Sequence, residues 1–334
     1  MATAKEIIDS YHKEVSNKIA SDLDQGKGFF WNNPANLSSL NPVNASTNNA
    51  YQGANRIRLA QAAVEMGLKD PRWVTATQAK EAGWKIKPNA VGVVCEMKYN
   101  YKGKDPSFRY FKVYNARDVE GIPEKKQSNN KYDESLDKAK LIVSSSDCKI
   151  VEKEHAFNAY MYKNDVIEME PLNKHDSEEA YLAKALYAVM RSTSNEGRLN
   201  RKALDISTER LISDIATAFL KSDLSIMFEE THFGHYSNTP KGKGYQELLE
   251  KNPDILFEAA NLASAACKYV HQNTLKEIND KVITKKNAKE NDISAEINSM
   301  QSSALNGLKQ IKENQRDIEK QNFQSSNRGR KTFR

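Results

Sequence analysis

Apolar residues recur at helical spacing in two stretches near the start of the chain. Positions three or four apart are apolar over residues 3–25, which predicts an amphipathic helix that Gly26 ends. The same spacing predicts a helix over 55–66 that Gly67 ends. The buried face of the first helix is expected to hold Ile7, Ile8, Tyr11, Val15 and Ile19.

A helix start and two strands follow. Thr75 and Gln78 have the spacing of a capping box, and Gly83 fits the position after the end of that short helix. Apolar and polar residues alternate over 91–101 and again over 108–115, which predicts two strands joined by a hairpin loop. On the second strand, one face holds Tyr110, Lys112 and Tyr114, and the other holds Arg109, Phe111 and Val113.

The segment 28–53 between the first two helices is rich in Asn, Ser and Pro, which favour turns. A loop of this length in a compact domain is usually either functional or disordered. The aromatic run Phe29, Phe30 and Trp31 argues against disorder here.

The second half changes from strand-like to helical character. Residues 121–137 are polar and charged, which predicts a surface loop, and short apolar runs within 139–170 predict further strands. Helical patterning follows over residues 178–192, 207–228 and 244–272. From 275 onward the chain is a polar linker that ends in a basic tail.

These patterns predict an α+β fold with an N-terminal α+β domain at 1–125, a mainly helical domain at 126–274 and a flexible basic tail at 275–334. Hydrophobic residues make up 39% of the 334, without a long apolar run, so we expect neither a membrane span nor a signal peptide. The three cysteines lie far apart in the chain, which favours reduced thiols in a protein of the cytoplasm.

Positive charge is concentrated in one segment. Residues 80–131 contain twelve Lys or Arg against six Asp or Glu, an excess of +6 that equals the net charge of the whole chain. A local basic stripe is typical of phosphate binding, although a solvated strand face has the same composition.

Aromatic residues are interleaved with these cations in the first 115 residues, which contain all three tryptophans. Single-stranded nucleic acid needs cations that follow the backbone and aromatic faces that stack on unpaired bases. Trp73 and Trp84 equally suit a core position, and Asn55 also suits a helix entry. The candidate contacts are Trp31, Tyr51, Asn55, Arg56, Arg58, Arg72, Trp73, Lys85, Lys87, Lys98, Arg109, Tyr110 and Lys112.

The order of these residues resembles the N-terminal domain of the ArdC antirestriction family, over roughly residues 5–123. The resemblance rests on Tyr51-Gln-Gly-Ala-Asn55, on Asp70-Pro-Arg-Trp73 with Thr75 and Gln78, and on Val113-Tyr-Asn115. It implies single-stranded DNA binding without strong sequence preference, and a second domain similar to zinc metallopeptidases.

The second domain departs from the family pattern at its metal helix. The resemblance implies an H-E-x-x-H helix followed by R-L-N-R, and Arg198-Leu-Asn-Arg201 is present. However, Tyr187 stands at the first His position, Ala188 at the catalytic Glu and Arg191 at the second His. Zinc needs two imidazoles one helical turn apart, so we expect a degenerate domain without metal or catalysis. His232-x-x-His235 is only a weak metal signal.

The sequence therefore predicts a non-enzymatic single-stranded DNA-binding protein of phage or mobile-element DNA metabolism, in the cytoplasm of a bacterial host. Single-stranded DNA is the expected partner, together with a phage or plasmid polymerase or replication protein. One alternative is an antirestriction protein that binds a host nuclease or another host enzyme. Another is a residual hydrolase that uses Glu209 and Asp214.

Overall fold

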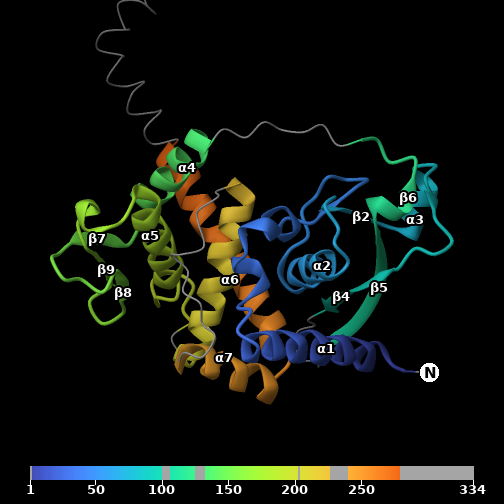
Figure 1. Ribbon diagram of the computed structural model, residues 1–334, viewed down its shortest axis with the longest axis horizontal. Helices are drawn as coiled ribbons and strands as arrows, with labels where there is room; N and C mark the ends of the chain where they lie inside the picture. The colour runs from blue at the N-terminus through green and yellow to red at the C-terminus, as the bar shows by residue number, and fades with distance from the viewer. Residues whose placement is uncertain (1, 100–105, 125–131, 202–203, 226–239, 279–334) are drawn as a thin grey trace, which may run out of the picture. The chain divides into compact units, whose positions relative to one another are not determined.

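The structure is a computed structural model. Residues 1–274 form one compact unit, and a second unit comprises Leu275–Arg334. Of the second unit only residues 275–278 are described, and these are helical, so the expected linker and basic tail lie largely outside the described part. The described residues, drawn as coloured ribbon in Figure 1, are 2–99, 106–124, 132–201, 204–225 and 240–278.

The first predicted helix is confirmed as α1, Ala4–Asp24. Thr3 and Glu6 form a capping box at its start, in which each side chain accepts a hydrogen bond from the backbone N–H of the other. The helix ends before Gly26, whose φ of +78° is the left-handed conformation that glycine adopts readily. The predicted apolar face is buried at Ile8, Tyr11, Val15 and Ile19.

A four-stranded sheet forms beside α1, with strand order β1-β2-β5-β4. Its strands are β1 Val43–Asn44, β2 Arg72–Thr75, β4 Val93–Tyr99 and β5 Ser107–Asn115. β1 and β2 are parallel, whereas β2, β5 and β4 pair antiparallel. Both predicted strands of the hairpin are thus confirmed, and the loop between them lies mostly outside the described residues.

The helix α2, Gly53–Glu65, covers one face of this sheet. It starts two residues earlier than the apolar pattern predicted. Its residues Leu59, Ala62 and Ala63 pack with the sheet residues Trp73, Val93, Cys95 and Val113 in a separate small core.

A second small module packs against β2. It comprises α3 Ala76–Glu81, β3 Lys85–Ile86 and β6 Val119–Glu120. The predicted capping box of Thr75 and Gln78 is confirmed, and Gly83 has a φ of +74° after the helix end. A 3-10 helix, η3 Ala116–Asp118, leads from β5 into β6.

The polar segment between α1 and α2 is ordered, as its aromatic residues indicated. It forms two 3-10 helices, η1 Phe30–Asn32 and η2 Pro34–Leu40. Phe29 stacks on Trp31 with ring centroids 4.2 Å apart, and both side chains are buried. This contact joins the segment to the main core, so the polar residues form a defined surface above it.

The region after the sheet differs from the prediction. The helix α4, Tyr132–Ser144, replaces the end of the predicted loop and also includes the Leu-Ile-Val run that we expected to form a strand. The other two apolar runs do form strands, as predicted. They belong to a three-stranded sheet of order β7-β9-β8, with β7 Lys149–Glu152, β8 Ala159–Met161 and β9 Val166–Met169, followed by η4 Leu172–Lys174.

Helices complete the compact unit. α5 Glu178–Ser192 and α6 Ile206–Leu224 confirm two predicted helices, although residues 226–228 lie outside the described part. The third predicted helix is two: α7, Pro240–Lys251, and the helical residues 255–278. Pro253 separates them because proline lacks the N–H that helix continuation requires.

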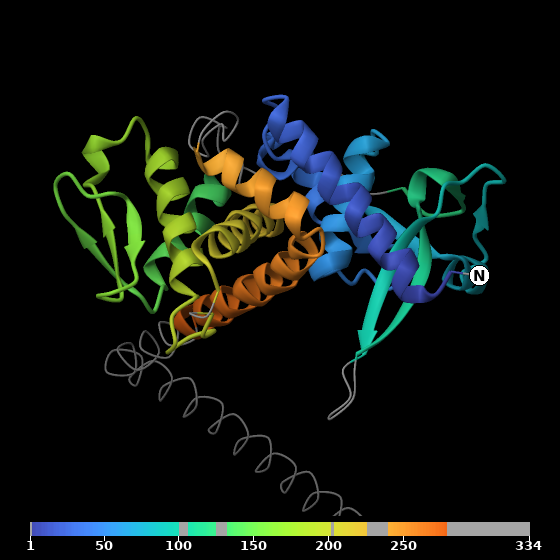
Figure 2. The same ribbon diagram turned by 90° about the horizontal axis from the view of Figure 1, so that it is seen from below.

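One hydrophobic core joins both halves of this unit. It contains residues of α1, α2, η2, α4, the three-stranded sheet, α5, α6, α7 and the last helix. Figure 2 shows α6 and the last helix side by side, next to α1 and α2. The predicted α+β class is confirmed. Within the described residues, no helix combines the length and apolarity needed to cross a bilayer.

The amino end of α2 is capped by the last helix. The N–H of Ala54 donates to Asn261 Oδ1 at 2.9 Å, and the N–H of Gly53 donates to Ser264 Oγ at 2.8 Å. Gly53 has a φ of +57°, and a Cβ there would lie 1.9 Å from Asn261 Oδ1. The first turn of α2 therefore accepts no side chain at this position while Asn261 caps it.

A buried histidine joins α1 to the sheet and to the segment before the last helix. The two ring nitrogens of His12 each lie 2.7 Å from a carboxylate oxygen, one of Glu96 and one of Asp254. The ring also stacks on Phe257 at 3.7 Å, and Tyr11 donates a hydrogen bond to Glu96. Burial raises the pKa of Glu96, but the hydrogen bonds from His12 and Tyr11 outweigh it and hold that pKa below its ordinary value.

We predict that Gly53→Ala lowers the free energy of unfolding more than Gly67→Ala does. Both glycines have positive φ, which costs about 1–2 kcal/mol for alanine. At Gly67 nothing lies within 4 Å of an added Cβ, whereas at Gly53 the new Cβ displaces the Asn261 cap. An unpaired buried N–H costs roughly 1–3 kcal/mol more. Urea unfolding followed by circular dichroism measures both values, and equal losses would refute the capping role.

We predict that Glu96→Gln reduces the loss of stability in acid. A carboxyl group with a lowered pKa stabilises the folded state above its unfolded pKa of about 4.3, and this contribution disappears as pH falls through the folded pKa. The variant should melt at a lower temperature than wild type at pH 7, with a smaller difference at pH 3. The exposed Glu81→Gln on α3 is the control. If the melting temperatures of wild type and Glu96→Gln differed by the same amount at pH 7 and at pH 3, the prediction would be contradicted.

Candidate nucleic-acid interface

The hairpin of β4 and β5 exposes four of the predicted contacts, which we call the ribbon cluster: Lys98, Arg109, Tyr110 and Lys112. In the antiparallel register, Tyr110 lies opposite Glu96 and Lys112 opposite Val94, so these side chains share one face. Tyr110 is 42% exposed, whereas Val113 of the opposite face is fully buried. The predicted division of β5 into two faces is confirmed.

Lys98 continues this face toward the hairpin end. It lies opposite Phe108, four residues along β5 from Lys112, which corresponds to about 13 Å at the usual rise of a strand. Tyr110 lies between the two lysines. The face therefore presents one aromatic ring between two cations, which is the combination that binds an unpaired strand.

The opposite face of the hairpin adds an arginine at its outer end. Arg109 is exposed and its guanidinium lies 5.6 Å from the ring centroid of Tyr99. In the antiparallel register Arg109 lies opposite Met97, which is 37% exposed. A guanidinium on an aromatic ring presents a flat cationic surface to phosphate or base.

Lys5, which was not among the predicted contacts, reaches the ribbon from α1. Its Nζ lies 5.3 Å from the ring centroid of Phe108, the residue that Lys98 also approaches, and it pairs with Asp9. Only the packing of α1 beside β5, visible in Figure 1, brings this lysine near the cluster. Its position on the polar face of α1 was the sole signal in the sequence.

Lys85 and Lys87 lie apart from the ribbon cluster, at and just after β3, and both are exposed. Lys87 Nζ donates to the backbone oxygen of Arg117 at 2.7 Å, so its charge stays close to β6. These two lysines mark a second basic site on the α3–β3–β6 module.

Two predicted aromatic contacts are core residues. Trp31 is 3% exposed and Trp73 is fully buried. Trp73 packs against Leu59 of α2 and Cys95 of β4 in the core between helix and sheet. Neither ring is available for stacking on a base in this fold.

Arg56 is 1% exposed and makes structural contacts with three segments. Its Nε donates to the backbone oxygen of Leu40 at 2.6 Å, and its Nη2 donates to that of Phe219 at 3.0 Å. The guanidinium also pairs with Asp223 at 2.8 Å. A buried guanidinium needs all these partners, so Arg56 has no free donor group for a phosphate.

Arg58 and Arg72 are also held by the protein. Arg58 Nη1 donates to Gln61 Oε1 at 2.9 Å, and its guanidinium lies 5.2 Å from the ring centroid of Tyr11. Arg72 forms a bidentate ion pair with Asp70, and its Nη1 donates to the backbone oxygen of Pro123. Asp70 neutralises much of the attraction that Arg72 offers to a phosphate.

Tyr51 and Asn55 form hydrogen bonds to other residues of the protein. Asn55 makes a pair of hydrogen bonds with the backbone of Glu96 in β4, at 2.8 and 2.9 Å. Tyr51 is half-buried, and its hydroxyl accepts a hydrogen bond from Asn44. Burial raises the pKa of Tyr51 to about 12. The polar residues of this motif therefore position the ribbon.

Arg191, one of the positions compared with a metal helix, belongs to an ion-pair cluster. Glu209 of α6 is buried and accepts hydrogen bonds from Arg201, at 2.9 and 3.3 Å. Arg191 Nη1 of α5 lies 3.7 Å from the same carboxylate. Asp214, the other carboxylate considered for hydrolysis, accepts a hydrogen bond from Tyr245. Both acids are thus paired inside the core.

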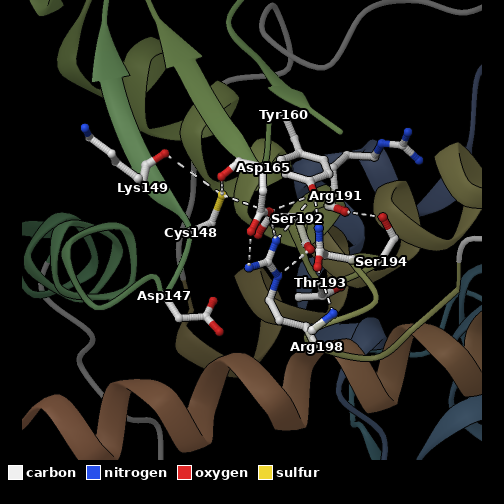
Figure 3. Close-up of polar contacts among 12 residues, drawn as sticks. Asp147, Cys148, Lys149, Tyr160, Asp165, Arg191, Ser192, Thr193, Ser194 and Arg198 are labelled. Carbon is white, nitrogen blue, oxygen red and sulfur yellow. Dashed lines mark hydrogen bonds and ion pairs between the residues drawn. The ribbon is translucent and has the colours of Figure 1, made fainter. Parts of the chain in front are cut away.

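The other arginine of the R-L-N-R motif lies in a neighbouring polar cluster, drawn in Figure 3. Arg198 pairs with Asp165, and its Nε donates to the backbone oxygen of Ser192 at 2.7 Å. Tyr160 donates to Asp165 at 2.9 Å. The hydrogen bond from Arg198 holds the pKa of Asp165 below its ordinary value. The motif therefore joins α5 to the three-stranded sheet.

The donor groups do not fit a zinc site. Guanidinium groups carry no lone pair for a metal and stay protonated, so Arg191 repels a cation from Glu209. Cys148 lies next to Asp165 in the cluster around Arg198. Burial raises the pKa of its thiol to about 11, which keeps the thiol protonated. Within the described residues, no three His, Cys, Asp or Glu side chains are grouped as metal ligands. The pair His232-x-x-His235 lies outside the described residues.

Comparison with known structures identifies the fold. Two crystal structures of the antirestriction protein ArdC from plasmid R388, one metal-free and one with bound Mn(II), each superpose with a TM-score of 0.63 at 21% identity. Each alignment covers 79% of this chain, and 98% or 97% of the ArdC chain. The similarity therefore extends over nearly the whole compact unit.

Sequence comparison adds a family and a longer relative. The DNA primase TraC of Escherichia coli is 22% identical over 290 residues, which is 76% of this chain. The chain spans about a quarter, 26%, of the length of that relative. The model of the N-terminal domain of anti-restriction factor ArdC matches residues 9–139. Residues 9–139 are thus similar to ArdC N-terminal domains, and the fold of the chain is ArdC-like.

Proposed function

We propose that this protein binds single-stranded DNA, largely without regard to sequence, in the DNA metabolism of a phage or mobile element. There it protects a displaced strand or recruits a polymerase or replication protein. The family and the plasmid protein ArdC support the setting. The observation that carries the proposal is the ribbon cluster, in which Tyr110 lies exposed between Lys98 and Lys112.

The arrangement favours a single strand over a duplex for a physical reason. An exposed tyrosine ring on a flat sheet gains energy by stacking on a base, and a base in a duplex already stacks on its neighbours. The flanking lysines attract phosphate in both forms. The aromatic residue therefore provides the preference for unpaired bases, and the lysines provide affinity that depends on salt.

We propose further that the protein acts by binding and not by catalysis. This part rests on the side chains at the degenerate metal helix. Arg191 and Arg201 hold Glu209, and Tyr245 holds Asp214, so neither carboxylate is poised to activate water. The cluster instead stabilises the packing of α5 on α6.

The alternative is an antirestriction protein that binds a host nuclease. The observation in its favour is an exposed apolar group around the three-stranded sheet, where Phe157 is 83%, Tyr162 44% and Leu172 43% exposed. Exposed apolar residues of this size are typical of surfaces that bind proteins. Co-purification of a host nuclease that depends on Phe157, by a protein that lacks affinity for oligo-dT, would favour this alternative.

We predict that labelled oligo-dT binds more tightly than the matching duplex in fluorescence anisotropy, and that affinity falls steeply between about 50 and 200 mM salt. Lys112→Ala should reduce the slope of log affinity against log salt by about 0.7, the value for one lost phosphate contact on a single strand. Lys149→Ala, an exposed lysine on β7, is the matched control and should leave the slope unchanged. Equal affinity for both DNA forms would refute the proposal.

We predict that Tyr110→Ala weakens oligo-dT binding by about 1–3 kcal/mol while leaving the salt slope unchanged, because the ring stacks on a base and carries no charge. Tyr162→Ala is the control, since this tyrosine in the turn after β8 has nearly the same exposure, 44% against 42%. Melting temperatures of both variants are measured in parallel. A lower melting temperature with unchanged affinity would show that Tyr110 is only structural.

A further inference from the structure

A cavity of about 950 Å³ lies between the polar segment that contains η2 and β1, the β3 module, and the ends of α4 and α6. Among these elements, α4 and α6 are labelled in Figure 1. The volume lies within the range of small-molecule and cofactor sites in proteins. Neither the ribbon cluster nor the arginine cluster contributes to its lining.

The walls combine one aromatic ring with a few hydrogen-bonding groups. Trp84 forms part of the lining and is half-buried. Asn41 lines the cavity with an Oδ1 atom that is buried and receives no hydrogen bond from the described residues. A buried amide oxygen without a donor is costly, and a ligand N–H group removes that cost. The hydroxyl groups of Ser38 and Ser46 lie in the same lining.

The lining of the cavity is close to neutral. Arg72 lines it but is paired with Asp70, and none of the described lining residues is an aspartate or glutamate. Lys85 follows Trp84 directly in the chain and is exposed.

We propose that this cavity receives unpaired nucleotides of the bound single strand, with a base on Trp84 and its N–H groups directed at Asn41. Aromatic stacking accepts any base, and the amide oxygen and serine hydroxyls pair with base edges. Lys85, which is exposed and follows Trp84 in the chain, supplies positive charge for a phosphate beside the cavity. This inference rests on the proposed function, and it adds a second site to the ribbon cluster.

A matched pair of charge substitutions tests the proposal. Ser46 lines the cavity and is exposed, whereas its neighbour Thr47 is equally exposed but does not line it. Ser46→Glu places a carboxylate where the nucleotide lies and should weaken oligo-dT binding by roughly tenfold, while Thr47→Glu should change it less than twofold. Both variants have the same net charge. Equal effects of the two substitutions would overturn the proposal.

Tryptophan fluorescence provides an independent measurement. All three tryptophans are described, and Trp84 alone lines the cavity, since Trp31 and Trp73 are buried in the core. Oligo-dT should quench the emission of the wild-type protein. Trp84→Phe, which keeps an aromatic side chain packed against Val74, Ala79 and Val119, should abolish most of that change. Quenching that persists in Trp84→Phe would overturn the proposal.

The outcomes separate this inference from the proposed function. Loss of binding in Lys112→Ala together with normal binding in Ser46→Glu would leave the function intact and remove the cavity from it. If wild type does not bind oligo-dT, the proposed function fails. Thymidine monophosphate then becomes the probe, and quenching that depends on Trp84 would support a nucleotide site, whereas its absence would overturn the inference as well.

Discussion

The amino end of α2 is the point on which the rest of this structure depends. A buried helix end leaves N–H groups that must find acceptors, and here Asn261 and Ser264 of the last helix supply them. One turn later, the guanidinium of Arg56 needs Asp223 and two backbone oxygens to remain buried. All of these partners except Leu40 lie far beyond residue 139, where the family match ends. The N-terminal domain of this chain is therefore incomplete without the helices that follow it.

The sequence predicted those parts of the fold whose causes are local. The end of α1 before Gly26, the capping box at Thr75 and the two faces of β5 each depend on residues within a few positions of one another. The helix α4 was missed because its first half is charged and its apolar run is too short to show a period. For Arg56 and Asn55, the residue types were informative but their partners were not. Polar groups that serve a buried helix end and groups that serve a ligand look alike in a sequence.

The arginine cluster shows how a buried carboxylate is held between two helices. Burying Glu209 of α6 without a partner would be costly, and Arg191 of α5 and Arg201 supply the positive charge that balances it. These ion pairs therefore join α6 to α5 and to the segment that follows α5.

In the proposed function, a buried motif contributes to DNA binding without touching DNA. Asn55 holds the backbone of β4 at Glu96, and Tyr110 lies opposite Glu96 on β5. His12 and Tyr11 fix the side chain of Glu96 from α1. An aromatic platform binds well only when its strand is rigid, because each ordered side chain costs entropy on binding. In the proposed function, the residues that hold Glu96 remove this entropy cost before binding. They therefore contribute to affinity indirectly, by fixing the position of Tyr110.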